Sequence, residues 1–118
     1  MNSYKFLKKH HLRTQRDFQT AYGEGAKTYS KMFTIFLCEN NLNYPRLGLS
    51  VRKKFGSAPQ RNKFKRRMRE IFRLNKNDIF PSVDIIIIPG NESANANFKQ
   101  LEKGFCYLLG ISQKQYDK

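Results

Sequence analysis

Residues 46–76 read RLGLSVRKKFGSAPQRNKFKRRMREIFRLNK and hold the pattern that decides the fold: a strand, a basic turn and one long helix. Leu47, Leu49 and Val51 alternate with small residues in the strand predicted over residues 46–51, so these three side chains are expected to face inward. The turn that follows is rich in lysine and arginine, which places positive charge directly before the helix.

The helix is expected to begin at Ser57 or Ala58 and to continue to about Lys76, because a proline, here Pro59, is favoured in the first turn. Four apolar side chains fall within one sector of this helix and predict the face that packs in the core: Phe64, Met68, Ile71 and Phe72. The helix is therefore expected to be buried on one side and exposed on the other.

The exposed side of the predicted helix carries a row of guanidinium groups headed by an amide: Asn62, Arg66, Arg69 and Arg73. Like charges at these spacings oppose helix formation, so a bound polyanion is expected to compensate for the repulsion. Guanidinium groups also suit bidentate contact with phosphate. Two alternatives stay open: a solvated basic face without a ligand, and an Asn62 that only caps the helix.

The chain before this segment predicts a short helix and two or three strands. The helix is expected after Thr14, because residues 14–17 resemble a capping box and suitable side chains follow at helical spacing: Phe18, Ala21 and Tyr22. Residues 31–38 alternate as a strand does, with Phe36 on the face opposite Phe33 and Ile35. A shorter strand before Lys31 could add a third.

The chain after the central helix predicts one more strand and one more helix. Residues 83–88 are almost continuously aliphatic, as in a strand that is buried on both faces. A last helix is expected to begin after Asn95 or Asn97 and to end at Gly110. The order α-β-β-β-α-β-α predicts an α+β fold, a two-layer sandwich of one domain over residues 1–118, with residues 1–12 as a basic, partly ordered N-terminal arm.

Composition narrows the function classes. The 118 residues carry a formal net charge of +14, and a polyanionic partner, most commonly nucleic acid, would relieve the self-repulsion. With 39% hydrophobic residues the chain can bury a core, which excludes a disordered basic tail. Cys38 and Cys106 lack metal-ligand spacing and are expected to be reduced, buried thiols. No apolar run is long enough to span a bilayer, so a cytoplasmic protein with no membrane partner is expected.

The stretch LGLSVRKKFGSAPQRNKFKRRMREIFR, residues 47–73, resembles the signature of the bacterial ribonuclease P protein component. The matching residues are Lys53, Lys54, Gly56, Arg61, Asn62, Lys65, Arg66 and Arg69. Residues 12–27 are similar to the family's first helix, and VDIIIIP is similar to its last strand. Lys63 departs from the third residue of the family's Arg-Asn-Arg, which keeps the charge but loses the bidentate fork.

The resemblance implies a subunit that assembles with a large catalytic RNA and assists endonucleolytic removal of the 5′ leader from precursor tRNA. The catalytic centre and its Mg²⁺ ions are then held mainly by the RNA, so no catalytic residue, metal site or tightly bound cofactor is expected in this chain. The implied partners are the catalytic RNA and precursor tRNA, with no obligate protein partner. The implied fold includes a left-handed strand–helix–strand crossover, although such units are nearly always right-handed.

The resemblance also divides the site residues between two surfaces. Those expected to bind the catalytic RNA are Lys53, Lys54, Arg61, Asn62, Lys63, Lys65, Arg66, Arg69 and Arg73. Those expected to bind the leader are Phe18, Tyr22 and Phe36, because stacking on aromatic rings accepts any base. Judged from the residues alone, Phe18 and Tyr22 are more typical of core residues than of a binding surface.

Other functions are weaker hypotheses. The nine acidic residues form no motif for metal-dependent nuclease chemistry. His10 and His11 are more typical of a phosphate contact, or of residues with no functional role, than of a metal site. The alternative function is a ribosomal-type structural RNA-binding protein, against which the Arg61-Asn62 motif argues. A DNA-compacting protein would leave the aromatic residues of the first helix without a purpose.

Overall fold

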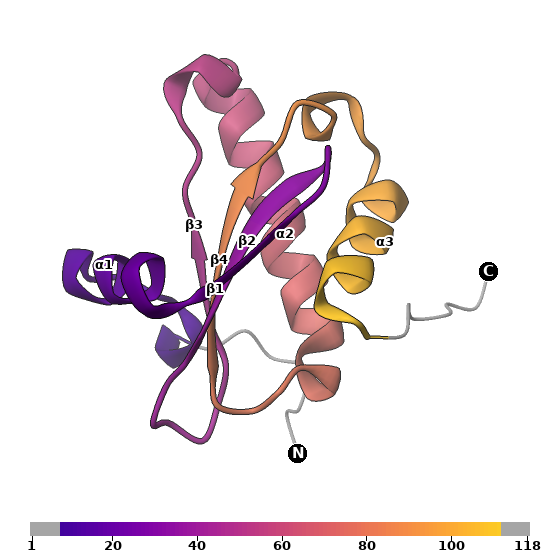
Figure 1. Ribbon diagram of the computed structural model, residues 1–118. Helices are drawn as coiled ribbons and strands as arrows, with labels where there is room; N and C mark the ends of the chain where they lie inside the picture. Colours follow the sequence, from indigo (N-terminus) through magenta and orange to yellow (C-terminus); the bar gives the residue numbers. More distant parts are fainter. Residues whose placement is uncertain (1–7, 112–118) are drawn as a thin grey trace.

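A four-stranded sheet in the order β1-β2-β4-β3 forms the centre of the molecule (Figure 1). The computed structural model describes residues 8–111. The helices are α1 (Gln15–Glu24), α2 (Ala58–Asn75) and α3 (Phe98–Leu109), and the strands are β1 (Ala26–Tyr29), β2 (Phe33–Glu39), β3 (Arg46–Leu49) and β4 (Val83–Pro89). Short 3-10 turns connect them: η1 (Lys8–His10), η2 (Lys53–Phe55), η3 (Lys76–Asp78) and η4 (Ser93–Asn95).

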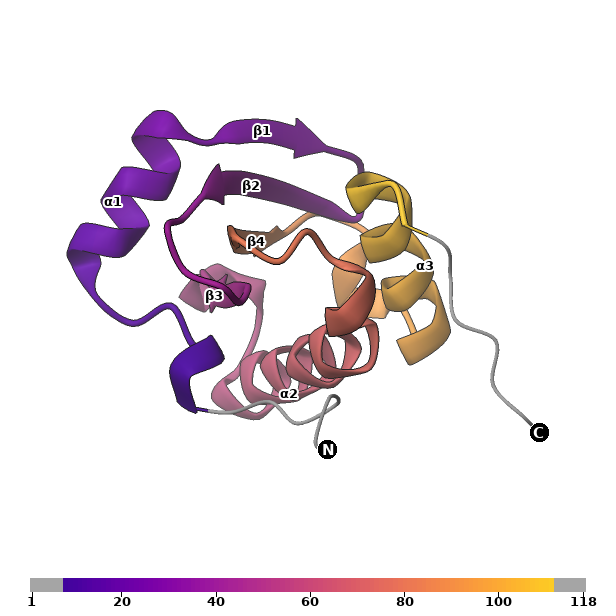
Figure 2. The ribbon, with the colours of Figure 1, turned by 90° about the horizontal axis from the view of Figure 1, so that it is seen from below.

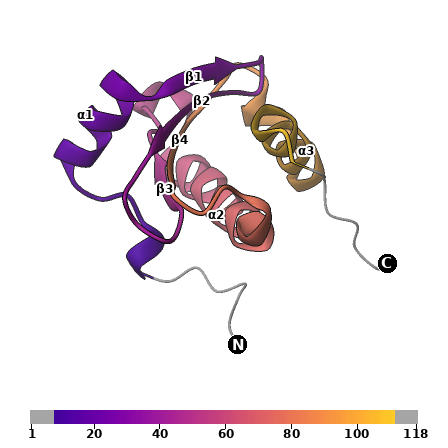
Figure 3. The same ribbon diagram turned by 60° about the horizontal axis from the view of Figure 1, so that its bottom comes forward.

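The helices are distributed unequally over the sheet. Figure 2 shows α1 on one face and both α2 and α3 on the other, and Figure 3 shows the same division from an oblique angle. The predicted α+β fold and the predicted order of elements are confirmed, and β1 is the additional strand expected before Lys31.

Side-chain caps explain where the helices begin. The Thr14 hydroxyl accepts from the backbone N–H of Asp17 at 3.1 Å, so α1 starts where the sequence predicts. Ser57 and Gln60 form a reciprocal capping box at the start of α2, with Pro59 in its first turn. At the other end of the chain, α3 ends at Gly110, which adopts the left-handed conformation (φ 69°) that glycine tolerates.

Two strands differ from their predicted limits. β2 begins at Phe33 and not at Lys31, because Ser30 forms a turn in which its hydroxyl accepts from the Met32 N–H at 3.1 Å. β3 ends at Leu49 rather than at residue 51, although the Ser50 N–H still donates to the Ile87 carbonyl at 3.0 Å.

The β3–α2–β4 unit has the rare handedness that the resemblance implied. β3 and β4 are parallel neighbours, and α2 connects them. In Figure 1, β3 and β4 run upward and α2 runs downward. Figure 2 shows β4 between β3 and β2. The same view shows that α2 and α1 lie on opposite faces of the sheet. Viewed from α2 with the strands pointing up, β4 lies to the left of β3. The crossover is therefore left-handed, against the general rule.

The main core lies between the sheet and the helices α2 and α3. All four side chains of the predicted stripe are buried there: Phe64, Met68, Ile71 and Phe72. A smaller cluster lies under α1 and contains the buried residues Leu12, Ala21, Cys38 and Ile86. α1 packs on the sheet through this smaller cluster. The aromatic side chains of α1 stay partly exposed to solvent, as described below.

The segment before α1 packs along the edge of the sheet. His11 forms an isolated parallel bridge with Leu47, and the Leu12 N–H donates to the Leu47 carbonyl at 2.9 Å. His10 and Leu12 are buried. The part of the predicted arm that covers residues 1–7 lies outside the described residues. Both cysteines are buried thiols that form no disulfide within the described residues. No helix within residues 8–111 is long and apolar enough to cross a membrane.

Candidate nucleic-acid interface

The exposed side of α2 and the preceding η2 turn form a continuous basic surface, here called the basic helix surface. Six of the nine residues predicted for the catalytic RNA are exposed on it: Lys53, Lys54, Asn62, Lys63, Arg66 and Arg69. The four on α2 follow the side of the helix that faces away from the core stripe, as the helical phase predicts, and Lys53 and Lys54 lie in η2. This surface can contact several phosphates of a folded RNA at once.

The other three predicted residues are half-buried, and two of them have partners within the protein. Arg61 donates to the Gly56 carbonyl at 2.6 Å and thereby fixes the η2 turn to the start of α2. Arg73 donates twice to Glu70, at 2.9 and 2.5 Å, and this contact lowers the pKa of the Glu70 carboxyl. Arg73 therefore brings less net charge to the surface than the exposed arginines do. The third, Lys65, lies in a groove described below.

A neighbouring arginine that the prediction left aside has a structural role. Arg67 is half-buried and donates to the Ala96 carbonyl at 3.2 Å, so it connects α2 to the turn before α3. The basic residues of α2 therefore divide into exposed groups that face solvent and groups that hold neighbouring segments in place.

The three aromatic residues predicted for the leader lie together on the opposite face of the sheet. The rings of Tyr22 and Phe36 meet edge to face with centroids 5.0 Å apart, and the Phe18 ring lies 6.3 Å from Tyr22. Phe18 and Phe36 are half-buried and pack against the small core, whereas Tyr22 is 37% exposed and packs against the two rings. Lys27 places its ammonium group 6.0 Å from the centre of the Phe36 ring. This ring cluster has the mixed aromatic and cationic character that single-stranded RNA requires.

The position of α1, and hence of the ring cluster, depends on an ion-pair network. The sequence indicated Asp84 as a structural partner of an arginine or lysine but did not identify which one. Arg46 on β3 donates to both carboxylate oxygens of Asp84 on β4, at 2.8 and 2.7 Å, and to Asp17 on α1 at 3.1 Å. Gly48 supports the same arrangement, because a Cβ at this position would come within 2.7 Å of the Phe18 ring. Through Arg46 and Gly48, β3 thus determines where α1 lies on the sheet and how closely the Phe18 ring approaches the sheet.

A groove joins the two surfaces around the β3 edge of the sheet. It has a volume of about 220 Å³ and is lined by His11, Leu12, Phe18, Leu47, Leu49, Lys65 and Arg69. Phe18 of the ring cluster therefore lies in the same groove as Lys65 and Arg69 of the basic helix surface. The sequence assigned these residues to separate surfaces, whereas the structure places them at a shared boundary.

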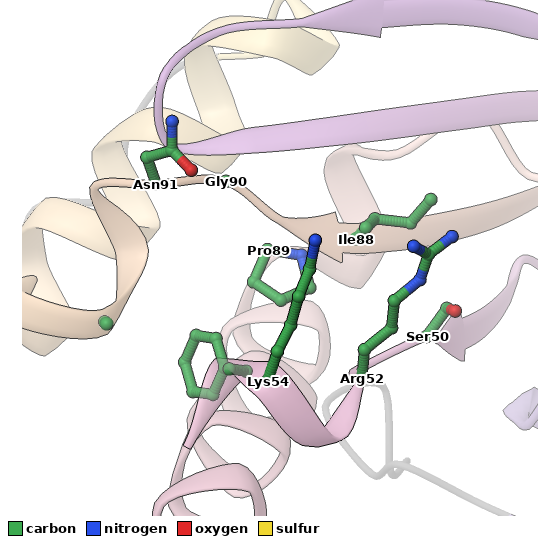
Figure 4. A pocket seen from close by; sticks show the side chains of 9 residues that line it. Ser50, Arg52, Lys54, Ile88, Pro89, Gly90 and Asn91 are labelled. Carbon is green, nitrogen blue, oxygen red and sulfur yellow. The ribbon is translucent and has the colours of Figure 1, made fainter.

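A larger pocket of about 560 Å³ lies between the η2 turn and the end of β4. Its lining is Ser50, Arg52, Lys54, Phe55, Ile88, Pro89, Gly90, Asn91 and Ala94. Figure 4 shows the side chains of Arg52 and Lys54 extending from η2 toward β4. Arg52 was not predicted as a site residue, although its place beside two lysines was a usable signal. The pocket combines an aromatic ring, two cations and an amide, a lining suited to a nucleotide.

Two carboxylates near these surfaces, Asp84 and Glu70, are engaged with other side chains. Within residues 8–111, no three side chains of His, Cys, Asp or Glu lie close enough to share a metal ion. Asp84 accepts from Arg46 and Asn40, and Glu70 accepts from Arg73. These two carboxylates therefore already have cationic or amide partners within the protein.

Comparison with known proteins decides the family. The profile of the family described as Ribonuclease P matches residues 6–112. The chain belongs to the ribonuclease P protein family. A ribonuclease P component takes part in an endoribonuclease that processes tRNA, so this membership implies an RNA partner.

Individual relatives agree with this assignment. The ribonuclease P protein component of Syntrophus aciditrophicus (strain SB) is 37% identical over 111 residues, which cover 94% of this chain and 90% of that protein. The corresponding protein of Thermotoga maritima is 44% identical over 84 residues, which cover 71% of this chain and 72% of that protein.

Solved structures of ribonuclease P proteins show the same fold. A Staphylococcus aureus RNase P protein, a mutant with defective mRNA degradation activity, superposes with a TM-score of 0.82 at 33% identity and covers 87% of each chain. The RNase P protein from Thermotoga maritima superposes with a TM-score of 0.78 at 37% identity, covering 84% of this chain and 94% of that one. At these identities the likeness extends beyond fold alone to the family.

Proposed function

We propose that this chain is the protein subunit of a cytoplasmic ribonuclease P, in which it binds the catalytic RNA and the 5′ leader of precursor tRNA. The observation that carries the proposal is the pairing of an exposed cationic row on α2 with an aromatic cluster on α1 and β2, joined by a groove at the β3 edge. The first surface suits a folded RNA backbone, and the second suits an unpaired strand.

The basic helix surface is proposed to hold the catalytic RNA. Arg66, Arg69 and Lys63 are exposed along α2, and neither Arg66 nor Lys63 makes a hydrogen bond or ion pair with another described residue. Phosphate contact neutralises such charges and releases counterions, so the affinity should fall steeply with salt. Lys63 supplies charge there without the bidentate geometry of an arginine.

The leader is proposed to lie across the face of the sheet that carries α1. It would enter at the groove beside Phe18, stack on Tyr22 and Phe36, and continue toward the pocket that contains Arg52 and Lys54. Ser50 and Ile88, which line this pocket, belong to the same face of the sheet as Gly48 and Ile86, because side chains alternate along a strand. Stacking along this path would bind leaders of varied sequence.

The chemical step is proposed to occur in the RNA, with Mg²⁺ held mainly there. In support, the carboxylates described above are engaged with arginine or amide partners. Mg²⁺ would stabilise developing charge on the phosphate oxygens, and this chain would raise the affinity for substrate and for the ions around it. The alternative of a ribosomal-type structural RNA-binding protein has no support in the family assignment.

Reconstitution tests this proposal. The chain is mixed with a ribonuclease P RNA at a magnesium concentration too low for the RNA to cleave precursor tRNA alone, and it should restore cleavage. Arg66→Ala/Arg69→Ala should lose most of this stimulation, whereas Lys99→Ala/Lys103→Ala, which removes the same charge from exposed positions on α3, should keep it. No stimulation by the wild-type chain would refute the proposal.

A second comparison tests the leader surface. Phe18→Ala should weaken the binding of leader-bearing precursor tRNA more than the binding of mature tRNA by the holoenzyme, by about 1–3 kcal/mol if one stacked base is lost. An equal loss for both RNAs would return Phe18 to a purely structural role.

A further inference from the structure

The groove at the β3 edge contains a histidine, His11, for which the function proposed above gives no role. Its backbone is fixed by the bridge to Leu47 and by the neighbouring Leu12 N–H, which donates to the Leu47 carbonyl at 2.9 Å. The imidazole is half-buried and lines the groove together with Phe18, Lys65 and Arg69. His11 is therefore held at the place where the cationic surface and the ring cluster meet.

The charged groups around this imidazole are cationic. Among the described residues, α2 contributes Lys65 and Arg69, and the segment of His11 itself contributes Arg13, while the neighbouring His10 is neutral above pH 5.5. The side chains that β3 and α1 add to the groove are apolar. Burial and then the positive charges of Arg69 and Arg13 lower the pKa of His11 from its ordinary value, which favours the neutral imidazole in the free protein.

We propose that the groove binds one phosphodiester of RNA between Lys65, Arg69 and His11, and that His11 takes up a proton when the phosphate binds. The inference rests on the proposed function, since it requires RNA at this edge of the sheet. A phosphate placed among these groups brings a negative charge beside their positive ones, and it favours the protonated imidazole. Because linkage is reciprocal, protonation of His11 strengthens the binding of the phosphate by the same factor.

The coupling has a defined sign and size. The pKa of His11 rises on binding, so affinity for RNA increases as the pH falls through the range between the bound and free values. Each unit of this rise allows at most about a tenfold gain in affinity. His10, whose pKa is lowered to about 4, stays neutral above pH 5.5 and leaves this range to His11.

The experiment measures dissociation constants between pH 5.5 and 8 for wild type, His11→Gln and His11→Lys. The wild type should gain about threefold to tenfold in affinity toward pH 5.5. His11→Gln should bind more weakly at low pH, with the pH dependence of the wild type largely lost, and His11→Lys, with a permanent charge, should bind tightly throughout. Isothermal titration in two buffers of different ionisation enthalpy should detect proton uptake by the wild type that is absent in His11→Gln.

Two arms of the experiment distinguish the source of the phosphate. Coupling seen with the catalytic RNA alone assigns the phosphate to that RNA. Coupling seen only when the holoenzyme binds precursor tRNA, and not mature tRNA, assigns it to the leader. Equal pH dependence in wild type and His11→Gln would overturn the inference, while failure of the wild type to bind either RNA at any pH would instead overturn the proposed function.

An NMR titration keeps the inference testable if the variants do not fold. The pKa of the His11 imidazole in the wild-type chain is measured with and without bound RNA. A rise on binding supports the coupling, and an unchanged or lowered value refutes it.

Discussion

Replacing Arg46 by methionine should destabilise the protein more than any exposed basic substitution. The variant keeps most of the aliphatic side chain but removes the two hydrogen bonds to Asp84 and the one to Asp17. β3 and β4 would then lose their charged cross-link, and α1 would lose its polar connection to the sheet.

The magnitude follows from the burial of the pair. The side chains of Arg46 and Asp84 are 18% and 8% exposed. Removing one partner of a buried ion pair costs about 3–5 kcal/mol, because the other charge stays buried. Asp84 would keep one hydrogen bond, from the Asn40 amide at 2.7 Å, so the lower end of this range, about 3 kcal/mol, is expected. That is a large share of the roughly 5–15 kcal/mol that stabilises a typical domain.

Urea unfolding followed by circular dichroism measures the loss. Arg16→Met, on the exposed side of α1, is the control and should change the free energy of unfolding by less than about 0.5 kcal/mol. Arg46→Met/Asp84→Leu leaves no charge buried at this site and should be at least about 1 kcal/mol more stable than Arg46→Met. A loss below about 1 kcal/mol in Arg46→Met, or no recovery in the double variant, would refute the reasoning.

Three further predictions concern single positions. Arg66→Ala should make the slope of log RNA affinity against log salt concentration shallower by about 0.7–0.9. Arg73→Ala should change this slope less, because Arg73 already pairs with Glu70. Equal changes of slope in the two variants would contradict the prediction. Gly48→Ala should displace the Phe18 ring and lower the free energy of unfolding in urea by about 1–3 kcal/mol. It should also weaken leader binding. Unchanged NMR signals of the Phe18 ring would contradict the prediction. His10 has a pKa of about 4 in the folded protein, lowered first by burial and then by Lys76 and Lys9, so the unfolded chain binds more protons between pH 4 and 6.5. The free energy of unfolding should therefore fall as the pH is lowered through this range, by up to about 1.4 kcal/mol per pH unit. His10→Gln should lose this part of the pH dependence.

The sequence predicted the helices well because their signals are local. Ser57, Pro59 and the apolar stripe define the start and the buried face of α2 within a few residues, and Thr14 does the same for α1. The limits of the strands were less predictable. Where a strand ends depends on its neighbours in the sheet and on turns such as the one at Ser30, which alternation of side chains does not show.

The site residues follow the same division. The exposure of Arg66 and Arg69 came directly from the helical phase. The partner of Arg61 is the carbonyl of Gly56, whose position depends on the conformation of the turn.

Contacts between residues far apart in the sequence could not be predicted from local patterns. Arg46 and Asp84 are 38 positions apart and meet only because β3 and β4 are neighbours through an uncommon left-handed crossover. The groove around His11 likewise forms only when α1, β3 and α2 come together.

Site-specific photo-crosslinking tests the division into two RNA surfaces most directly. A photoreactive side chain is placed at Tyr22 in the ring cluster, or at Arg66 on the basic helix surface, in the holoenzyme bound to precursor tRNA. Position 22 should crosslink to nucleotides of the 5′ leader, and position 66 should crosslink to the catalytic RNA. Crosslinks from both positions to the same RNA, or a crosslink from position 22 that persists unchanged with mature tRNA, would contradict the account.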